Sequence, residues 1–434
     1  MRILHYGLGY PPERTGGLIQ YVMDLLSEQV NQKHEVAYLF PGRLDFFNSS
    51  VRIKQNVPRI DGVASFEIIN SLPLAVFGGI KEPEKFLRSV DCSVYENLLN
   101  EFKPDIIHIH SLMGIHKEFF EAASEKRIKI VYTTHDYFGL SPNPTFYFNN
   151  KSWDKENTLN YWLNVSQGAM STKKLKVVQL SFYAKLRDKI KKFKRSSFQK
   201  ESYYFLKNNE DFSSETRKDF KDLREYYQSI FNLINVFHFS SNTAKQVFER
   251  NISKPISGEV INITNSTILG GKRQIVLDMS KIKKITYIGQ YASFKGFYDF
   301  IVLAENCADK SMQFEIYGEN IDVPLPANVV NKKRFSSGGR DKVFKNLQLL
   351  IIPSRWKETF GFLELEALSY QCPVFVSDNV GSKELIPESF VFEEGKLVTF
   401  VNNAIALTKK GTFEVRLPTF QEHAFALNKL YEKA

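Results

Sequence analysis

The amino-acid sequence predicts an α/β protein with two doubly wound, parallel-sheet domains that face a cleft. Two observations support this prediction. Short apolar strands alternate with helical patterns along most of the 434 residues, and the alternation starts again after a glycine-containing break at residues 269–273. Short strands separated by helices are typical of parallel sheets. A chain of this length can also bury two full cores.

The first predicted domain covers residues 1–268. Gly16 and Gly17 precede apolar residues at helical spacing, so a helix is expected from there to residue 30. A second helix is expected from residue 242. Strands are expected at residues 2–6, 35–40, 105–110, 130–134, 233–240 and 260–263. The alternation weakens in residues 141–230, which are polar, aromatic and basic, and a helical insertion is predicted there.

The second predicted domain covers residues 269–417. Its strands are expected at residues 284–288, 313–317, 349–352 and 374–376, with helices between them. The tail from residue 420 to 431 has a helical pattern. Residues 418–434 are therefore expected to form a helix that packs back on the first domain.

Composition narrows the possible classes of protein. The chain is 43% hydrophobic and 24% charged, which argues against disorder. Its three cysteines are far apart and form no CxxC or Cys/His pair, so neither a disulfide framework nor a structural zinc site is expected. No apolar run of signal-peptide or membrane-spanning type occurs. The expectation is a cytoplasmic protein.

The net charge of +10 is concentrated in one segment. Residues 173–200 contain eleven Lys or Arg and a single acid, Asp188. Four apolar residues recur there at helical spacing: Phe182, Leu186, Ile190 and Phe193. Such a basic amphipathic segment suits an anionic membrane surface, here the inner face of the cytoplasmic membrane. The alternative is a solvated helix that packs on its own domain. No nucleic-acid-binding motif accompanies the charge, so nucleic acid is not an expected partner.

The stretch 353–386 is the most informative part of the chain. A loop with Glu358 leads into a predicted helix with Glu366, eight residues later. On a helix that spacing is about 12 Å of rise. The close pair of a retaining glycosidase needs roughly 5–5.5 Å, so that chemistry is excluded. The two acids can hold different parts of one long ligand. Glu364 lies about 200° round the helix from Glu366, so at most one of them faces the cleft.

Two glycine-containing turns could bind phosphate. Gly16 and Gly17 let the backbone approach a ligand at a helix start, although a simple tight turn is the alternative. Lys295 opens a later helix, after Gly289 and Gln290 end a strand, and a lysine there can neutralise phosphate. Turn chemistry alone is again the alternative. The GxG at residues 7–9 lacks the third glycine of a dinucleotide site, so no NAD is expected.

Histidines follow or occupy two predicted strands. His135 and Asp136 come directly after a strand, at the edge of the sheet where α/β proteins bind ligands. His108 and His110 alternate on another strand and therefore point the same way. No carboxylate lies at metal-ligand spacing beside them, so a structural role is favoured over a metal site.

Together these motifs resemble the retaining glycosyltransferases of the GT-B fold, family 4. The most specific part is Glu358-x7-Glu366 within PS-x-x-x-E-T-F-G…LEAL…PV…SDNVG…E. The supporting parts are Gly16–Gly17, KPDIIHIHS, TTHD, SSNTAKQVFER and VINITNSTI. The resemblance covers nearly the whole chain outside residues 141–230. It implies two Rossmann-like domains and a nucleotide-diphosphate sugar, UDP- or GDP-linked, in the cleft between them.

The resemblance also implies roles for individual residues. His135, Glu358 and Lys295 would be catalytic: His135 at the reacting sugar, Glu358 on the donor sugar and Lys295 on the diphosphate. The other donor-binding residues would be Gly16, Gly17, Gly289, Gln290, Phe360, Gly361 and Glu366, with Glu366 on the ribose hydroxyls. Asp136 would orient the site. Enzymes of this type retain anomeric configuration and need neither a metal nor a cofactor.

The sequence departs from the family pattern at two positions. Relatives usually have arginine where this chain has Gln290, so stabilisation of the leaving diphosphate could fall by a few kcal/mol. Arg355 or Arg273 could compensate. Relatives also tend to have glycine at Gln371, where a left-handed conformation would cost about 1 kcal/mol.

Two functions follow from these expectations. The first is a hexosyltransferase-type enzyme that transfers a sugar to a polysaccharide or lipid-linked acceptor in cell-surface glycan biosynthesis. The alternative is a non-catalytic GT-B partner subunit that binds acceptor or stabilises an active transferase. Gln290 favours the alternative, whereas the intact Glu358, Glu366, Lys295 and His135 favour the enzyme.

Overall fold

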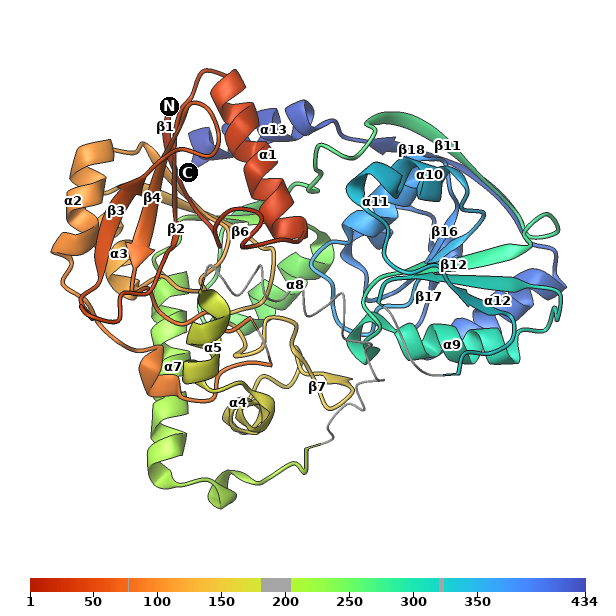
Figure 1. Ribbon diagram of the computed structural model, residues 1–434, viewed down its shortest axis with the longest axis horizontal. Coiled ribbons are helices and arrows are strands. Elements are labelled where there is room, and N and C mark those ends of the chain that lie inside the picture. Colours follow the sequence, from red (N-terminus) through yellow and green to blue (C-terminus); the bar gives the residue numbers. More distant parts are fainter. Residues whose placement is uncertain (77, 181–203, 320–323) are drawn as a thin grey trace.

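The structure is a computed structural model that describes residues 1–76, 78–180, 204–319 and 324–434 (Figure 1). Its N-terminal half is built on an eight-stranded sheet with the order β10-β9-β6-β5-β1-β2-β4-β3. The strands are β1 (Arg2–Tyr6), β2 (Glu35–Pro41), β3 (Arg52–Asn56), β4 (Val63–Ile69), β5 (Ile106–Ile109), β6 (Lys129–Thr133), β9 (Val236–Phe239) and β10 (Gly258–Val260). All neighbours are parallel except β3 and β4.

The C-terminal half is built on a second, six-stranded parallel sheet with the order β14-β13-β12-β15-β16-β17. Its strands are β12 (Lys284–Ile288), β13 (Gln313–Tyr317), β14 (Val329–Asn331), β15 (Leu350–Ile352), β16 (Val374–Ser377) and β17 (Val391–Phe392). Two parallel, doubly wound α/β sheets confirm the predicted fold class.

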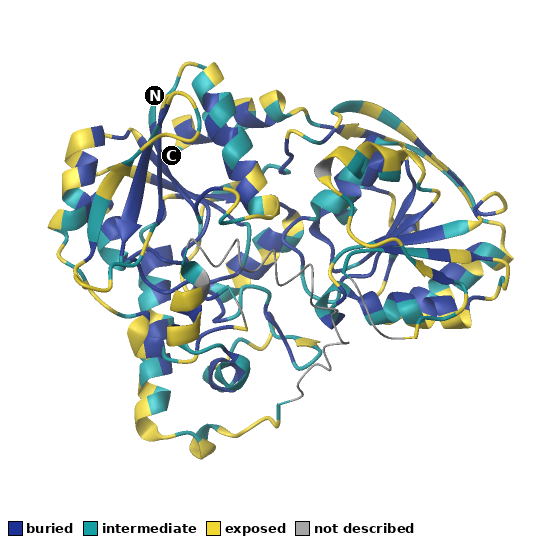
Figure 2. Cartoon of the chain, in the orientation of Figure 1, coloured by how far each residue is buried: buried dark blue, intermediate teal, exposed yellow. Residues whose placement is uncertain are grey.

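Helices cover both faces of each sheet, so the strands are buried on both sides (Figure 2). Around the N-terminal sheet lie α1 (Gly17–Asn31), α2 (Ser93–Phe102), α3 (Lys117–Glu125) and α8 (Asn242–Asn251). Around the C-terminal sheet lie α9 (Phe297–Asn306), α10 (Arg340–Lys345), α11 (Phe362–Ser369) and α12 (Leu397–Ala406). No helix within the described ranges is long and apolar enough to cross a bilayer.

The last helix, α13 (Phe420–Lys433), lies on the N-terminal half beside α1 (Figure 1). Gln29 of α1 donates a hydrogen bond to the Tyr431 hydroxyl at 3.0 Å, and Asn428 donates to Gln32 at 2.7 Å. The helix begins at a capping box formed by Thr419 and Glu422. The chain therefore crosses back to the N-terminal half after completing the second sheet.

The described residues of the range 141–230, which are 141–180 and 204–230, combine helices with a short hairpin. This hairpin, β7 (Tyr147–Phe148) and β8 (Lys151–Ser152), comes before α4 (Leu159–Val165) and α5 (Thr172–Gln179). α7 (Ser214–Phe231) then buries Phe220, Leu223 and Tyr227 in the same core as the N-terminal sheet. This helix is thus part of the core layer and not a separate attachment. The predicted membrane-binding segment 173–200 lies mostly outside the described residues.

Several strands escaped sequence analysis. β3 and β4 were not expected, and the break at residues 269–273 opens a strand: β11 (Gly271–Asp278) pairs antiparallel with β18 (Lys410–Leu417). The side chains of this two-stranded ribbon alternate between exposed and half-buried or buried, so it carries little apolar signal.

The predicted domain boundary at residue 268 stays a prediction. Gln371, at the position where glycine is usual in the family pattern, has φ 61° and so adopts the left-handed conformation considered above.

Candidate active site

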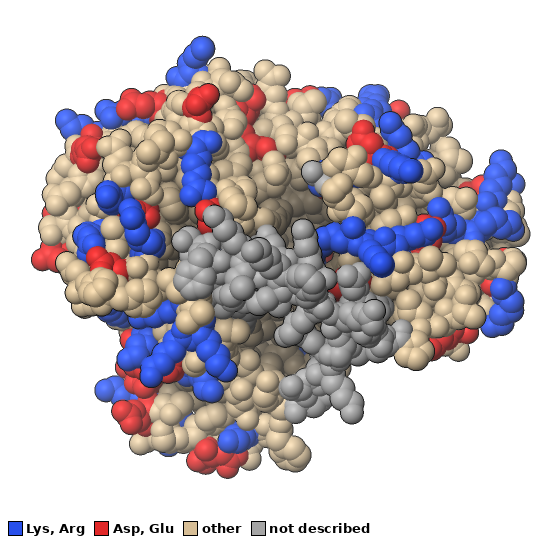
Figure 3. All heavy atoms as spheres, in the orientation of Figure 1, with Lys and Arg blue, Asp and Glu red and all other residues tan. Residues whose placement is uncertain are grey.

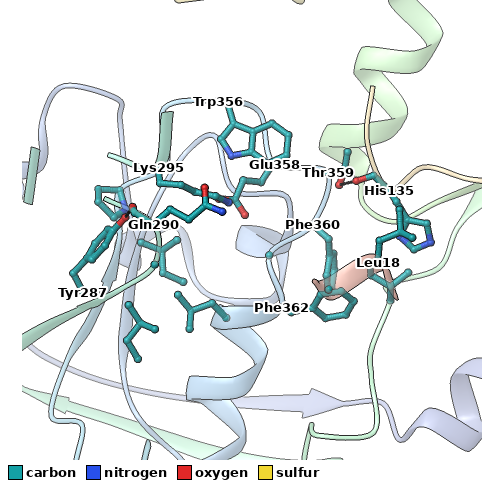
Figure 4. A pocket seen from close by; sticks show the side chains of 18 of the residues that line it. Leu18, His135, Tyr287, Gln290, Lys295, Trp356, Glu358, Thr359, Phe360 and Phe362 are labelled. Carbon is teal, nitrogen blue, oxygen red and sulfur yellow. Dashed lines mark hydrogen bonds and ion pairs between the residues drawn. The ribbon is translucent and has the colours of Figure 1, made fainter. Parts of the chain in front are cut away.

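A cavity of about 430 Å³ lies where strands of both sheets end (Figures 3 and 4). Strand β12 leads into Gly289 and Gln290, β15 leads toward Glu358, and β6 leads to His135. Carboxyl ends of parallel strands are the usual ligand side of such sheets. The cavity brings together eight predicted site residues: Gly17, His135, Gly289, Gln290, Lys295, Glu358, Phe360 and Gly361.

Glu358 is the most constrained of these residues. Its side chain is nearly buried, and its Oε1 accepts hydrogen bonds from Lys295 Nζ at 2.8 Å and Ser354 Oγ at 2.5 Å. Its backbone N–H donates to Asn379 at 2.9 Å. The Lys295 ammonium also lies 5.0 Å from the centre of the Trp356 ring. The Glu358 carboxylate and the Lys295 ammonium are therefore held together at the cavity wall.

Gly296 makes this arrangement possible. It has φ 69°, which an L side chain rarely adopts, and it caps α9 immediately after Lys295. A Cβ at this position would lie 1.7 Å from the Pro353 carbonyl oxygen. Only glycine therefore lets the Lys295 turn approach the loop that leads to Glu358.

Two helix N-termini meet at the cavity. α1 begins at Gly17 and α11 at Phe362, and neither has a side-chain cap. A Cβ on Gly17 would lie 3.0 Å from the Phe362 ring, so the two helix starts pack closely. The first N–H groups of a helix lack internal partners and lie at the positive end of its dipole. Together with Lys295 they make the cavity suitable for a phosphate group.

His135 joins the two halves of the molecule at this site. Its backbone carbonyl accepts a hydrogen bond from Thr359 Oγ1 at 2.9 Å, and its Nε2 lies 3.3 Å from His110 Nδ1. Burial lowers the pKa of His135 to about 3, with a smaller contribution from His238. The imidazole is therefore neutral at pH 7.

Asp136 does not line the cavity. Burial raises its pKa to about 6, and its carboxylate accepts a hydrogen bond from the Phe138 backbone N–H at 2.9 Å. That contact closes the local turn after β6. The predicted orienting role of Asp136 therefore stays a prediction.

Gly16 and Glu366 also lie outside the lining residues. Gly16, at φ 132°, precedes the helix start. Glu366 Oε1 lies 3.5 Å from Arg340 and accepts a hydrogen bond from Thr267 at 3.4 Å, and burial raises its pKa. Glu364 is fully buried, and one of its oxygens accepts a hydrogen bond from Ser382. The two acids thus have different environments and neither lines this cavity, while a role for Glu366 on ribose stays a prediction.

The suggested compensation for Gln290 is not present at the cavity. Gln290 lines it, but Arg355 is engaged by Asp299 and Arg273 donates to main-chain carbonyls near residues 269–270 and 369. Neither arginine is a lining residue. Among the described residues that line the cavity, Lys295 is the only Lys or Arg.

Sequence analysis assigned no role to four residues that build the site: Ser354, Trp356, Thr359 and Asn379. Ser354 and Asn379 fix Glu358, Trp356 contacts Lys295, and Thr359 contacts His135. All but Asn379 lie within six residues of Glu358. Their proximity to that acid in the sequence was the available signal.

Comparisons with known proteins find similarity to glycosyltransferases. Residues 15–170 match the model of glycosyltransferase family 4. An uncharacterised 42.6 kDa protein in the cps region of Klebsiella pneumoniae is 22% identical over 315 residues. That match covers 69% of this chain and 65% of the relative, a little under two thirds of the relative's length.

Three solved structures have a similar fold over almost the whole chain. Sucrose-phosphate synthase from Thermosynechococcus elongatus is 12% identical and has a TM-score of 0.53, covering 99% of this chain and 98% of that chain. A trehalose-6-phosphate structure from E. coli, bound with UDP-2-fluoro glucose, is 10% identical with a TM-score of 0.54, covering 100% and 99%. The lipopolysaccharide outer core galactosyltransferase WaaB, in its apo form, is 13% identical with a TM-score of 0.53, covering 100% of both chains. The chain thus has the GT-B fold of these glycosyltransferases, and its residues 15–170 match the model of glycosyltransferase family 4.

Proposed function

We propose that the protein is a retaining, metal-independent glycosyltransferase that uses a UDP- or GDP-sugar. The observation that carries this proposal is one cavity that combines the Lys295–Glu358 pair with the N-termini of α1 and α11. Phosphate-binding N–H groups and a sugar-binding carboxylate are what a nucleotide-diphosphate sugar requires. A relative of the same fold binds UDP-2-fluoro glucose, which supports this donor class.

In the proposed reaction, Lys295 and the two helix N-termini stabilise the negative charge that develops on the diphosphate as its bond to the sugar breaks. The acceptor hydroxyl attacks the anomeric carbon from the same face. Its proton passes to the leaving phosphate oxygen as the new bond forms, so configuration is retained. Glu358, held by Ser354 and Lys295, binds the sugar, and neutral His135 also lines the cavity.

The acceptor is proposed to be a polysaccharide or lipid-linked glycan in cell-surface glycan biosynthesis. Two similarities support this class: the fold of a lipopolysaccharide galactosyltransferase, and the relative from the cps region of Klebsiella pneumoniae. The N-terminal half would bind the acceptor, because the carboxyl ends of its strands lie at the same cavity as the donor residues.

The test measures sugar release and transfer from a panel of nucleotide sugars. Lys295→Ala and Glu358→Ala are expected to lower the rate by about 10²–10³-fold, as loss of one preorganised charge contact does. Lys332→Ala is the matched control, since it also breaks a Lys–Glu pair, with Glu315 at 3.3 Å, but outside the cavity. Equal rates for all three variants would contradict the site assignment.

A non-catalytic partner subunit is the second candidate, because with Gln290 the described lining of the cavity contains a single Lys or Arg, Lys295. Isothermal titration calorimetry separates the two candidates. The enzyme is expected to bind a UDP, GDP or ADP species with micromolar affinity, and Lys295→Ala should weaken that binding. A partner subunit should bind none of them.

We further propose a cytoplasmic location with peripheral contact to the inner membrane face through residues 173–200. The supporting observation is that Lys173, Lys174 and Lys176 on α5 are exposed. Flotation with anionic vesicles at low salt tests this contact. Replacing the three lysines by glutamine should reduce flotation, whereas the same replacement of exposed Lys272, Lys281 and Lys410 should not. Absence of flotation by the wild-type protein would exclude the contact.

A further inference from the structure

Behind the cavity wall, five histidines form one continuous series of hydrogen bonds through the N-terminal half. The series starts at the Ile261 carbonyl and passes through His238, Thr133, His108 and Tyr431 at distances of 2.8, 2.8, 2.6 and 2.7 Å. It continues through Gln29, His5, His110 and His135 at 3.0, 2.6, 3.0 and 3.3 Å. The last member, His135, lines the cavity.

The Ile261 carbonyl fixes the direction of every bond because it can only accept. His238 must therefore donate from Nε2, which leaves its Nδ1 to accept from the Thr133 hydroxyl. The Thr133 hydroxyl donates its only proton to His238, so its oxygen accepts a hydrogen bond from His108 Nε2–H. The remaining nitrogen of His108 then accepts from the Tyr431 hydroxyl.

The same logic extends to the cavity. Tyr431 has donated its proton and accepts from the amide NH₂ of Gln29, whose oxygen accepts from His5 Nε2–H. His5 Nδ1 accepts from His110 Nε2–H, and His110 Nδ1 accepts from His135 Nε2–H. His135 therefore carries its proton on Nε2, and its Nδ1 has a free lone pair.

Two further observations agree with this assignment. Burial lowers the pKa of His5 and His238 to about 4 and that of His108 and His110 well below the ordinary value, so each ring has one proton to donate at pH 7. His135 Nδ1 has no hydrogen-bond partner among the described residues and is not one of the buried unpaired atoms. Because the ring is half-buried and His135 lines the cavity, Nδ1 is the ring nitrogen left to meet a ligand there.

A metal site is the competing explanation for part of this series. His5, His108 and His110 each place a ring nitrogen within 4.8 Å of the others. A metal ion would need a free lone pair from each ring. In the directed series every one of these lone pairs already accepts a hydrogen bond, from His110, Tyr431 and His135. The contacts therefore favour a relay of hydrogen bonds.

We propose that this series fixes the ring tautomer of His135, so that Nδ1 presents a hydrogen-bond acceptor, and not a donor, to the cavity. His110 and Tyr431 are then positioning residues, although Tyr431 lies on the last helix of the chain. The chemical consequence rests on the proposed function: Nδ1 selects a sugar hydroxyl, which can donate, and disfavours a group that can only accept.

Tyr431→Phe tests the direction of the series. Without the hydroxyl, the Gln29 amide loses the acceptor that fixes its orientation. If the amide turns over, it donates to His5, and each following ring exchanges its donor and acceptor nitrogens. His135 would then accept at Nε2 and carry its proton on Nδ1. The variant is therefore expected to hold both tautomers of His135, whereas the wild type holds one.

The experiment is a ¹H–¹⁵N correlation spectrum of histidine-labelled full-length protein, which separates protonated from bare ring nitrogens. The chain has eight histidines, and His135→Gln identifies the signal. Wild type should show a bare Nδ1 at His135. Tyr431→Phe and His110→Phe should instead show a mixture of the two His135 tautomers. Tyr6→Phe is the matched control, because it removes a buried hydroxyl bound to Met113 at 2.6 Å in the same sheet.

A protonated Nδ1 in the wild type, or an unchanged tautomer in both variants, overturns the proposal. Stoichiometric metal in the purified protein overturns it as well. The transfer rate adds a second readout: across the variants it should fall with the fraction of His135 that keeps Nε2–H. A protein that shows the tautomer change but transfers no sugar supports the series and rejects the proposed function, so the two failures are distinguishable.

Discussion

At the scale of single residues, the carboxyl of Glu364 is a buried acid near the site whose pKa is strongly raised. It is fully buried on α11, and among the described residues only one of its oxygens has a partner, Ser382. Burial raises its pKa to about 8, with smaller contributions from Glu358 and Glu384. The folded protein therefore keeps a proton here at pH 7 that the unfolded chain releases near pH 4.5.

The raised pKa of Glu364 predicts the direction in which the free energy of unfolding changes with pH. The contribution of Glu364 to the free energy of unfolding is fully present below pH 4.5 and is lost as pH rises through about 8. Relative to Glu364→Gln, which cannot ionise, the wild type should lose up to about 1.4 kcal/mol per pH unit in that window and nothing further above it. Urea unfolding from pH 5 to 9 measures the difference. Parallel curves for the two proteins would show that the buried carboxyl ionises normally.

Residue-level sequence analysis selected residues that the structure brings together where the signal lies in the local sequence, and their roles stay predictions. Lys295, Glu358 and His135 each follow a strand, and the structure brings them to one cavity. It could not find the series of hydrogen bonds behind His135, because Gln29, His110 and Tyr431 come together only after the sheet and the last helix have assembled. Arg355 was misjudged for the same reason, since its partner Asp299 lies 56 residues away.

At the scale of elements, the turn between Lys295 and α9 is the most demanding piece of backbone at the cavity. Gly296→Ala places a side chain at φ 69° and against the Pro353 carbonyl. The left-handed conformation costs about 1–2 kcal/mol, and overpacking adds about 1–3 kcal/mol. The free energy of unfolding from urea titration should therefore fall by about 2–5 kcal/mol.

Gly395→Ala is the control for this effect. Gly395 has φ 80° but no atom within 4 Å of an added Cβ, so its substitution costs only the free energy of placing an alanine in the left-handed conformation. It should cost about 1–2 kcal/mol. Equal losses at the two glycines would mean that the Lys295 turn can move away from residue 353, and that Gly296 does not hold the two segments together.

Element prediction from sequence succeeded for several strands of the two sheets. Strands β1, β5, β12 and β16, which are buried except at some end residues, lie within a residue of their expected bounds. The ribbon of β11 and β18 was missed because its side chains alternate and its partners lie more than a hundred residues apart. β3 pairs only at the sheet edge and has a polar sequence, RIKQN, which gives no apolar signal.

At the scale of the whole molecule, the two halves meet through polar contacts beside the cavity. Ser240 and Ser241 both donate to the Thr359 carbonyl, at 2.8 and 2.7 Å, while Thr359 donates to His135. Glu384 accepts from the side chains of Asn242 and Asn262 at 2.7 Å each. The loop that carries Glu358 is thus hydrogen-bonded to the N-terminal half, and the shape of the cavity depends on how the halves sit.

A ligand that fills this cavity should therefore stabilise both halves at once. A nucleotide sugar at 100 times its dissociation constant adds about 2.7 kcal/mol to the free energy of unfolding. We expect a single thermal transition that moves upward with the preferred donor, and a smaller movement in Lys295→Ala. Differential scanning fluorimetry over a panel of nucleotide sugars identifies that donor, with Lys332→Ala as the control. If only part of a split transition moved, the ligand would bind one half alone, and the polar contacts around Thr359 would not couple the two sheets.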